Sequence, residues 1–342
     1  MAYQLKQLPE DFIVKEISKV ELKPNGRYLY FKLKKRGHNT LTALTYLAKK
    51  LNLKETQFGF AGNKDKEAVT EQVCSVYGTS KDKLLGVRLS DISIEFLGYG
   101  DAPIALGDLG GNKFEIVIRN LNKEIIMPIK YFPNYFDEQR FSKSNVERGE
   151  ALVRKDFKTA VKLEHSKECE LHLQKIPTDF VGALKQVPMR LLRLYVNSYQ
   201  SRMWNETLAR YLRKKGKVMK EEDYSQGKLV FVEKAEQFSE LNVPIIGFDA
   251  EELDADVEIK KIIVELMQEE KLEHADFIIK QIPQLTLEGE LRKGFAEVKE
   301  LVVGKEEKDE LNPGKKKVKV SFRLGKGSYA TVAIRVVVNF GQ

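Results

Sequence analysis

The sequence predicts an α+β protein in which both ends of the chain build one strand-bearing domain, with a mainly helical segment inserted between them. Strand-like alternation of apolar and polar residues occurs near both termini, at 28–34 and 318–324. Residues from about 145 to 290 instead carry long helical patterns. The net charge also differs between the inserted segment and the C-terminal end: it is −7 for residues 249–273 and +5 for residues 301–342. Any surface for a polyanion is therefore expected mainly on the strand-bearing ends.

The N-terminal part reads as a strand, a turn and a helix. In residues 28–34, leucine and phenylalanine alternate with tyrosine and lysine, which predicts one buried face and one aromatic, basic face. After the break at 36–39, Thr40 can cap a helix over 41–51, where leucine and alanine recur at helical spacing. A shorter alternation at 114–118 predicts a further strand.

The middle and the C-terminal part continue the pattern. Around Trp204 we expect a helix on which Gln200, Arg202 and Asn205 could line a groove. The charged run 306–317, with Asn-Pro-Gly inside it, predicts a turn before the last strand. Ser328 can then cap a helix that continues through Val337. The simplest division is 1–150 and 296–342 for the strand-bearing domain and 151–295 for the insertion.

Composition bounds the class of protein. The chain has 342 residues, 58 Lys+Arg against 50 Asp+Glu, and a net charge of +8, which favours binding to polyanions. With 42% hydrophobic and 32% charged residues it is ordinary globular composition. No window reaches the roughly 18 uninterrupted apolar residues of a membrane span, so we expect a cytoplasmic protein. Cys74 and Cys169 are too few for a disulfide framework.

The most unusual stretch is Phe58 to Gln72, where glycines precede a carboxylate set between two lysines. Glycines let the backbone turn tightly, and neighbouring ammonium groups of Lys64 and Lys66 favour the ionised form of Asp65. Asp65 could then serve as a nucleophile or a base. The structural alternative is a turn aspartate in a solvated ion pair, which is common in charged turns.

Three other stretches have a functional and a structural interpretation. Residues 134–141 offer aromatic rings beside amide, acid and guanidinium groups, which suits a flipped base or simply the end of a core strand. Residues 324–331 supply backbone amides and Lys326, which could bind phosphate or form a plain turn. His165, Cys169 and His172 lie at helical spacing and could bind zinc, but a fourth ligand is absent nearby.

These stretches, in this order, resemble the TruD family of tRNA pseudouridine synthases. Residues 61–72 are similar to the family's A-G-x-K-D-K/R-x-A-V-T-x-Q motif, and residues 134–141 to N-Y-F-G-x-Q-R-F-G. Further blocks that resemble the family are 6–12, 110–114 and 327–331. The resemblance spans nearly the whole chain and is weakest between about 215 and 290. Asp137 and Ser142 depart from it, because they replace glycines of the second motif.

The resemblance implies isomerisation of a uridine in tRNA to pseudouridine, with U13 of the D-arm favoured, and with neither a metal nor an organic cofactor. It implies a pseudouridine-synthase fold, with a mixed, largely antiparallel sheet, interrupted by an inserted TRUD domain. By position in the motifs, Asp65 matches the catalytic aspartate, Lys6 the basic residue near it, and Asn134 the nearby amide.

The resemblance also implies how the substrate is held. Phe136 matches the aromatic residue that stacks on the target base. Further substrate contacts are expected from Lys64, Lys66, Gln139, Arg140, Lys326 and Tyr329. tRNA is the expected partner, without a membrane or an obligate protein partner. The alternatives are a non-catalytic RNA-binding or chaperone protein on the same fold, and a zinc protein centred on the His-Cys-His group.

Overall fold

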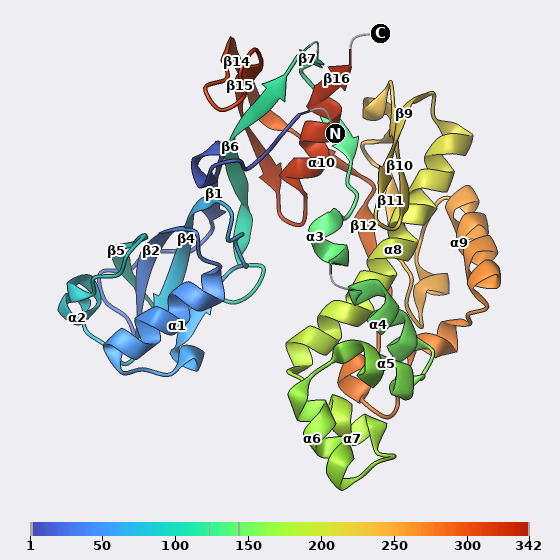
Figure 1. Cartoon of the computed structure of the whole chain (residues 1–342), viewed down its shortest axis with the longest axis horizontal. Coiled ribbons are helices and arrows are strands. Elements are labelled where there is room, and N and C mark those ends of the chain that lie inside the picture. The colour runs from blue at the N-terminus through green and yellow to red at the C-terminus, as the bar shows by residue number, and fades with distance from the viewer. Residues whose placement is uncertain (1–2, 123, 143, 341–342) are drawn as a thin grey trace. The chain divides into compact units, whose positions relative to one another are not determined.

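One mixed sheet gathers strands from both ends of the chain (Figure 1). The computed structural model describes residues 3–122, 124–142 and 144–340. The strands of this sheet are β1 (Phe12–Ser18), β2 (Tyr28–Arg36), β3 (Phe58–Phe60), β4 (Val69–Val76), β5 (Ile92–Gly100), β6 (Leu109–Leu121), β14 (Lys299–Lys308) and β15 (Lys316–Gly325). Their order is β14-β15-β6-β1-β4-β2-β5, with β3 paired to β4. β1 and β4 are parallel and the other neighbours antiparallel, which confirms the mixed, largely antiparallel α+β fold.

Helix α1 (Thr40–Leu51) covers part of one face of this sheet. The apolar residues of β2 at Leu29, Phe31 and Leu33 pack in one buried cluster with Leu44 and Leu47 of the helix. The short helix α2 (Lys81–Gly86) adds Leu84 to the same cluster. Burying these side chains against one another stabilises this region, because apolar area removed from water contributes roughly 25 cal/mol per Å².

Two predicted helix N-caps are each corrected by one residue. Asn39 rather than Thr40 caps α1, with its Oδ1 accepting from the backbone N–H of Thr42 at 2.8 Å. The C-terminal helix α10 (Ala330–Val337) has Tyr329, not Ser328, at its N-cap and no side-chain cap. Thr40 does not cap α1, because its hydroxyl bonds to Gln72 and to the Lys64 N–H, which local propensity does not reveal.

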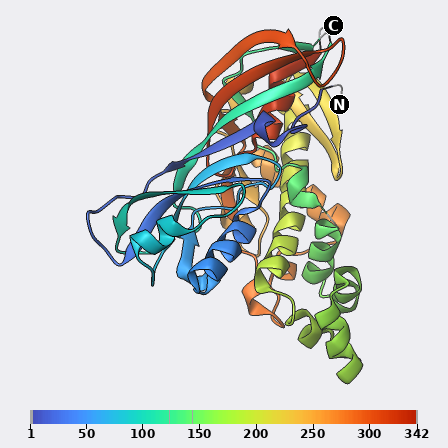
Figure 2. The same cartoon turned by 60° about the vertical axis from the view of Figure 1, so that its left-hand side comes forward.

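The remaining elements of this part of the chain lie near the C-terminus. A two-stranded sheet pairs β7 (Glu124–Ile126) with β16 (Val338–Phe340), directly after α10. In Figure 2 the long strands β6, β15 and β14 run side by side, from teal through red to orange-red. The last strand of the large sheet therefore pairs with residues about 200 positions earlier in the chain.

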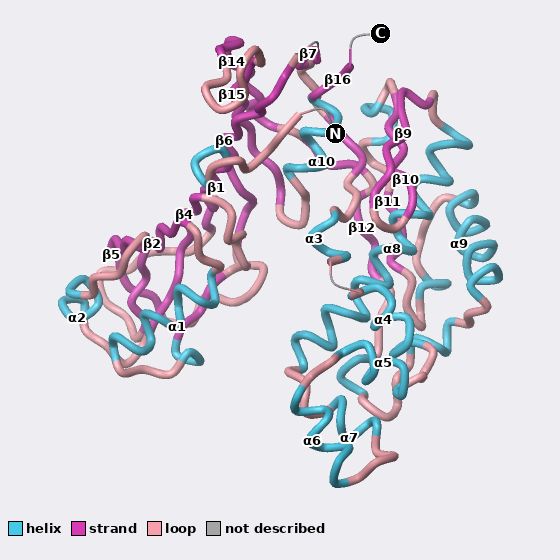
Figure 3. Tube along the Cα trace, viewed as in Figure 1, coloured by secondary structure: helices cyan, strands magenta, loops and turns pink. Residues whose placement is uncertain are grey.

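The segment between these ends is mainly helical, as expected, and also contains short strands (Figure 3). Its helices are α3 (Glu138–Phe141), α4 (Asn145–Val153), α5 (Phe157–Glu164), α6 (Lys167–Lys175), α7 (Phe180–Leu184), α8 (Met189–Lys215) and α9 (Val257–Glu270). Its strands form three pairs: β9 (Val218–Tyr224) with β10 (Gly227–Val232), β11 (Asn242–Ile245) with β12 (Glu290–Lys293), and β8 (Tyr131–Pro133) with β13 (Phe295–Glu297).

Helix α8 is the central element of this segment. It is 27 residues long and buries side chains on all sides, including Trp204, whose indole N–H donates to the carbonyl of Val243 at 3.0 Å. Helix α4 packs directly on it at Gly149, where an added Cβ would meet the carbonyl oxygen of Tyr195 at 2.1 Å. A helix buried all round needs the buried polar residues on it to be hydrogen-bonded.

The chain divides into two compact units, Met1–Lys130 with Glu297–Gln342, and Tyr131–Ala296. The expected return at residue 296 lies within one residue of this division. The expected first boundary at 150 falls inside α4, and the second compact unit begins about 20 residues before it, at Tyr131. Within the described ranges, none of the helices combines the length and apolar character that crossing a membrane requires.

Candidate active site

The first unit places Lys6 beside Asp65, 59 residues apart in the sequence. The ammonium Nζ of Lys6 donates to Oδ2 of Asp65 at 2.7 Å, and the two side chains are 21% and 23% exposed. Lys6 also lies 4.5 Å from the centroid of the Phe12 ring. Its backbone has φ +58°, a left-handed conformation that costs energy for a residue with a side chain. A part-exposed carboxylate with a fixed cation is therefore available to a reacting molecule.

Buried polar side chains hold the loop that carries Asp65. The backbone N–H of Lys64 donates to Thr40 Oγ1 at 2.9 Å, and the hydroxyl donates on to Gln72 Oε1 at 2.8 Å. Gln72 in turn donates from Nε2 to the carbonyl of Gly62 at 3.1 Å. Thr40 and Gln72 are almost completely buried, so these bonds are made away from water. Residues 62–64 are thereby tied to α1 and β4.

Lys64 does not lie where contact with substrate would need it. Its side chain is 6% exposed, and Nζ donates to Oε2 of Glu16, a carboxylate only 1% exposed, at 2.8 Å. The other oxygen of Glu16 accepts from the backbone N–H of Val73. This placement supports a structural role for Lys64 rather than the expected substrate contact. Lys66, two residues on, is exposed.

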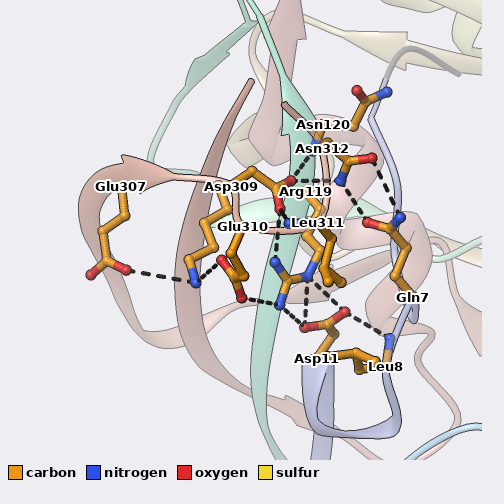
Figure 4. Close-up of polar contacts among 11 residues, drawn as sticks. Gln7, Leu8, Asp11, Arg119, Asn120, Glu307, Asp309, Glu310, Leu311 and Asn312 are labelled. Carbon is orange, nitrogen blue, oxygen red and sulfur yellow. Dashed lines mark hydrogen bonds and ion pairs between the residues drawn. The ribbon is translucent and has the colours of Figure 1, made fainter. Parts of the chain in front are cut away.

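A salt-bridge network fixes the chain directly after Lys6 (Figure 4). Arg119 of β6 donates to Asp11 at 2.9 Å, to Asp309 at 2.9 Å and to Glu310 at 3.1 Å. The side-chain amides of Gln7 and Asn312 bond to each other, at 2.8 Å in one direction and 3.4 Å in the other. Residues 7–11 are thus joined to the turn between β14 and β15.

The central charged side chains of this network are buried. The side chains of Arg119, Asp11 and Asp309 are at most 5% exposed. Burial opposes the ionisation of Asp309, but hydrogen bonds from the Asn120 N–H, Asn312 and other donors outweigh it and lower its pKa to about 2. Sequence reasoning missed this network because its members lie 108 and 190 residues apart and no local motif links them.

The second unit holds Phe136 by its backbone. The side-chain amide of Asn205 on α8 accepts from the Phe136 N–H at 2.9 Å and donates to the Phe136 carbonyl at 2.8 Å. Asn205 is 1% exposed, so the expectation that it lines a groove is wrong; Gln200, also buried, donates instead to the carbonyl of Ile246. The third residue of that expectation, Arg202, pairs with Glu270 at 2.7 Å.

Two guanidinium groups lie near the Phe136 ring. That of Arg292 on β12 is 4.2 Å from the ring centroid, and that of Arg140 on α3 is 5.5 Å away. Phe136 is 6% exposed, and the edge of Trp204 packs against it. Rings and guanidinium planes both serve as stacking surfaces for unpaired bases. The sequence gives no local indication of Arg292, whose position depends on pairing between β11 and β12.

Asn134 has a buried acceptor that points to a ligand. Its Nδ2 donates to the carbonyl of Lys293 at 3.2 Å, and its own carbonyl accepts from Arg292 at 2.9 Å. Oδ1 is buried and has no hydrogen-bond partner among the residues that the structure describes. A buried polar atom without a partner is costly, so this oxygen is suited to accept from a bound group.

The two departures from the glycine positions of the second motif cause no backbone strain. Asp137 has φ −101° and Ser142 has φ −61°, both of which are ordinary for residues with side chains. Asp137 is buried at the start of α3, and Ser142 ends that helix. Gln139 between them is exposed. The loop therefore accepts both side chains without needing glycine.

The remaining candidates are placed at the C-terminal turn and on two short helices. Lys326 is exposed after β15, next to Gly327 with φ +78°, and Tyr329 begins α10. His165 ends α5, whereas Cys169 and His172 lie on α6, where His172 bonds to Asp179. Throughout 3–122, 124–142 and 144–340, no three His, Cys, Asp or Glu side chains are grouped to hold a metal, which removes the basis for the zinc alternative.

Comparison with known proteins agrees with the motifs. The family described as tRNA pseudouridine synthase D (TruD) matches residues 1–171 and 161–337. A relative named "Probable tRNA pseudouridine synthase D 1" from Methanococcus maripaludis is 30% identical, over 98% of this chain and 99% of its own length. The tRNA pseudouridine synthase D of Aquifex aeolicus is 29% identical, over 98% of both chains.

A solved structure has the same fold. The crystal structure of a protein assigned as tRNA pseudouridine synthase D from Methanosarcina mazei matches with a TM-score of 0.68 and 26% identity. The match covers 97% of this chain and 92% of that one. The similarity therefore extends through both units rather than through one of them.

Proposed function

Because this chain belongs to the tRNA pseudouridine synthase D family, and so isomerises uridine in tRNA, we propose that the Asp65 carboxylate starts that reaction. The observation that carries the proposal is the Lys6–Asp65 pair, in which a part-exposed carboxylate has an ammonium 2.7 Å away. The backbone beside it is fixed by buried hydrogen bonds. Membership of the family favours this enzyme over the non-catalytic RNA-binding alternative.

Forming pseudouridine breaks the bond between N1 of uracil and C1′ of ribose and joins C5 to C1′. The proton of C5 is released to water, and N1 takes up a proton in exchange. Asp65 can begin this sequence either as a nucleophile or as a base at the ribose. In both cases the detached uracil must stay close and turn before it reattaches. The Lys6 ammonium orients the Asp65 carboxylate while the substrate approaches. Its positive charge also lies close enough to balance the charge of that carboxylate later in the reaction.

We assign the holding of the target base to Phe136 and Asn134. Asn205 fixes the backbone of Phe136, and Arg292 lies over its ring, so the platform is rigid. The buried Oδ1 of Asn134 is an acceptor for an N–H of the base. A flipped base is held in this way in other nucleic-acid enzymes, by stacking and by hydrogen bonds to its edge.

Further tRNA contacts are proposed for Lys66, Lys326 and Tyr329 of the first unit and for Gln139 and Arg140 of the second. Lys66, Gln139 and Lys326 are exposed, as contact with a phosphate backbone requires. Similarity of the two motifs to the family supports U13 of the D-arm as the target. Because the substrate is tRNA, the cytoplasm is the proposed place of action.

The test uses tRNA transcript that carries tritium at C5 of uridine. The wild-type protein is expected to release tritium, and the Asp65→Asn variant to release none above background while it still binds tRNA. Transcript with cytidine at position 13 is expected to release none with either protein.

Asp101→Asn is the matched control, because Asp101 is also ion-paired to a lysine, Lys23, in the same unit but is 66% exposed. It should release tritium at the wild-type rate. Release by Asp65→Asn at a rate close to that of wild type would show that another group starts the reaction.

A further inference from the structure

Lys35 lies near the end of β2 with its ammonium directed into the loop that carries Asp65. The residue is 1% exposed. Its Nζ donates to three backbone carbonyls: His38 at 2.6 Å, Lys64 at 3.2 Å and Asp65 at 2.8 Å. An ammonium has three N–H donors and no acceptor, so these bonds use all of them.

This ammonium is costly to keep inside the fold. In the described part of the chain its hydrogen bonds go to carbonyl oxygens, not to a carboxylate, and burial lowers the pKa of Lys35 to about 8. Burying a charge without an ion-pair partner opposes folding. A methionine would fill similar space without that cost. Packing therefore does not account for a lysine at this position.

The three bonds add something that the other ties of the loop do not. Thr40 and Gln72 hold Lys64 and Gly62, as described above. Lys35 holds the carbonyl of Asp65 itself, while Lys6 holds its carboxylate. The backbone and the side chain of Asp65 are thus each bound by a separate lysine.

We propose that Lys35 is a positioning residue for pseudouridine formation, which fixes the backbone of Asp65 so that its carboxylate keeps the orientation needed for reaction. The inference rests on the proposed role of Asp65 and deepens it. Lys35 is buried and acts through Asp65 rather than on the substrate. Small displacements of a reacting group cost large factors in rate, so a fixed backbone matters at this residue.

The rate is expected to depend on the charge of Lys35. As the pH rises through about 8 the ammonium loses a proton, which leaves two N–H groups for three carbonyls and removes the charge. The wild-type rate should therefore fall over this range. Burial raises the pKa of the nearby Cys74 thiol, which stays neutral there. The titratable groups that face Lys35, directly or through a partner, are Asp65, Lys64, Cys74, His38, Lys6 and Glu16.

The test compares Lys35→Met with wild type in single-turnover tritium release. We expect the rate to fall by about 10- to 100-fold, as for a misplaced catalytic group. The Kd for tRNA should stay within about twofold, because Lys35 is not at the surface. The decline of the rate above pH 8 should disappear, since the titrating group is gone.

Lys34→Met is the matched control, because Lys34 is the neighbouring lysine on β2, points to the other face and is 54% exposed beside Glu71. It should keep the wild-type rate and pH profile. Lys35→Arg is the second variant. Its guanidinium stays charged throughout the range, so the decline above pH 8 should be absent even if Lys35→Met fails to fold.

Two outcomes would overturn the assignment of Lys35. One is a folded Lys35→Met with a rate within twofold of wild type; the other is a decline above pH 8 that persists in Lys35→Arg. Failure of the proposed role of Asp65 is distinguishable from both, because it would appear as tritium release by Asp65→Asn. That result would remove the premise for Lys35 as well.

Discussion

At the scale of single residues, Asn205 binds both backbone groups of Phe136 from a neighbouring helix. Its side-chain amide accepts from the Phe136 N–H at 2.9 Å and donates to the Phe136 carbonyl at 2.8 Å, as the backbone of an adjacent strand would. These two bonds hold the backbone of Phe136 in place without using its ring. Asn205 thus determines the position of Phe136 without itself reaching the surface.

Replacing Asn205 with alanine should expose this role. The N–H and C=O of Phe136 would lose their partners inside the fold, which is expected to cost about 1–3 kcal/mol of stability. Single-turnover tritium release should slow because the platform is no longer fixed. Urea denaturation and the rate assay measure the two effects separately.

The control for this variant is Asn197→Ala, about two turns earlier on α8, which changes helix propensity in the same way. If Asn205→Ala were as stable and as active as this control, the two bonds to Phe136 would contribute to neither stability nor rate.

Functional residues within a continuous motif could be predicted from the sequence. Residues that bind backbone groups far away in the sequence could not. The motif around Asp65 is continuous, so its loop and the lysine partner expected from the family resemblance could be anticipated. Lys35 and Asn205 bind carbonyl or N–H groups, which every residue has, so no side-chain pattern indicates them. The burial of Lys64 against Glu16 likewise depends on the neighbouring position of β1 and β4 in the sheet.

At the scale of elements, the large sheet has a charged face that crosses several strands. Glu115 of β6 accepts from Lys15 of β1 and from Lys319 of β15, both at 2.9 Å. These two hydrogen bonds lower the pKa of Glu115 to about 2, from an ordinary value of 4.5. One carboxylate thus joins three strands, two of which come from opposite ends of the chain.

Stability of the sheet should therefore fall in acid. A carboxyl whose pKa is lower in the folded state than in the unfolded state stabilises the fold fully above the unfolded value, near 4.5. That contribution is lost as the pH falls from about 4.5 through about 2. Urea denaturation across this range should show a smaller loss of unfolding free energy in Glu115→Gln than in wild type.

Glu95→Gln serves for comparison, since Glu95 pairs with one lysine, Lys32, and is 63% exposed. The unfolding free energy of this variant should fall with decreasing pH as that of wild type does. A Glu115→Gln curve parallel to that of wild type would assign the acid sensitivity to other carboxyls.

Elements in which apolar residues recur at regular spacing were predicted well. The strand at 28–34 and the helix at 41–51 appear as β2 and α1 with small changes of boundary. Strand β9 was missed, because charged residues occupy both of its faces and a two-stranded pair needs no buried alternation. The start of α1 was off by one residue because Thr40 is engaged with Lys64 and Gln72 instead of capping.

At the scale of the whole molecule, charge is distributed unevenly along the chain. The net charge of +8 combines an acidic stretch at 249–273, which includes α9, with basic residues in the C-terminal strands. Polyanion binding by such a chain releases counterions from the nucleic acid. The affinity for tRNA is expected to fall steeply as salt rises.

Lys326→Gln tests where this dependence arises. The loss of one phosphate contact should weaken binding and reduce the slope of log Kd against log salt by about 1. Filter binding between low and moderate salt measures it. Lys217→Gln is the comparison, because Lys217 is exposed but already paired with Glu233. An unchanged slope in Lys326→Gln would place the phosphate contacts elsewhere.

The division of the chain could be predicted only in outline. Charge and periodicity indicated an insertion, and its return was placed within one residue of the observed unit boundary. The start of the insertion was placed later than the first residue of the second unit, because α3 and β8 are short and show no regular spacing of apolar residues. The parallel pairing of β1 with β4, and the position of β1 between β4 and β6, depend on contacts that no local pattern encodes.

The order of strands in the sheet also bears on how the protein is made. β15 is the partner of β6 and is translated almost 200 residues after it, with residues 131–296 emerging in between. Until then the β6 edge and its apolar residues Phe114, Ile116 and Ile118 lack their cover, and Arg119 lacks Asp309. An open apolar edge is a site for wrong pairing between nascent chains. A ribosome that stops before residue 309 therefore releases a chain that is prone to aggregate and lacks both β15 and the turn that anchors the segment after Lys6.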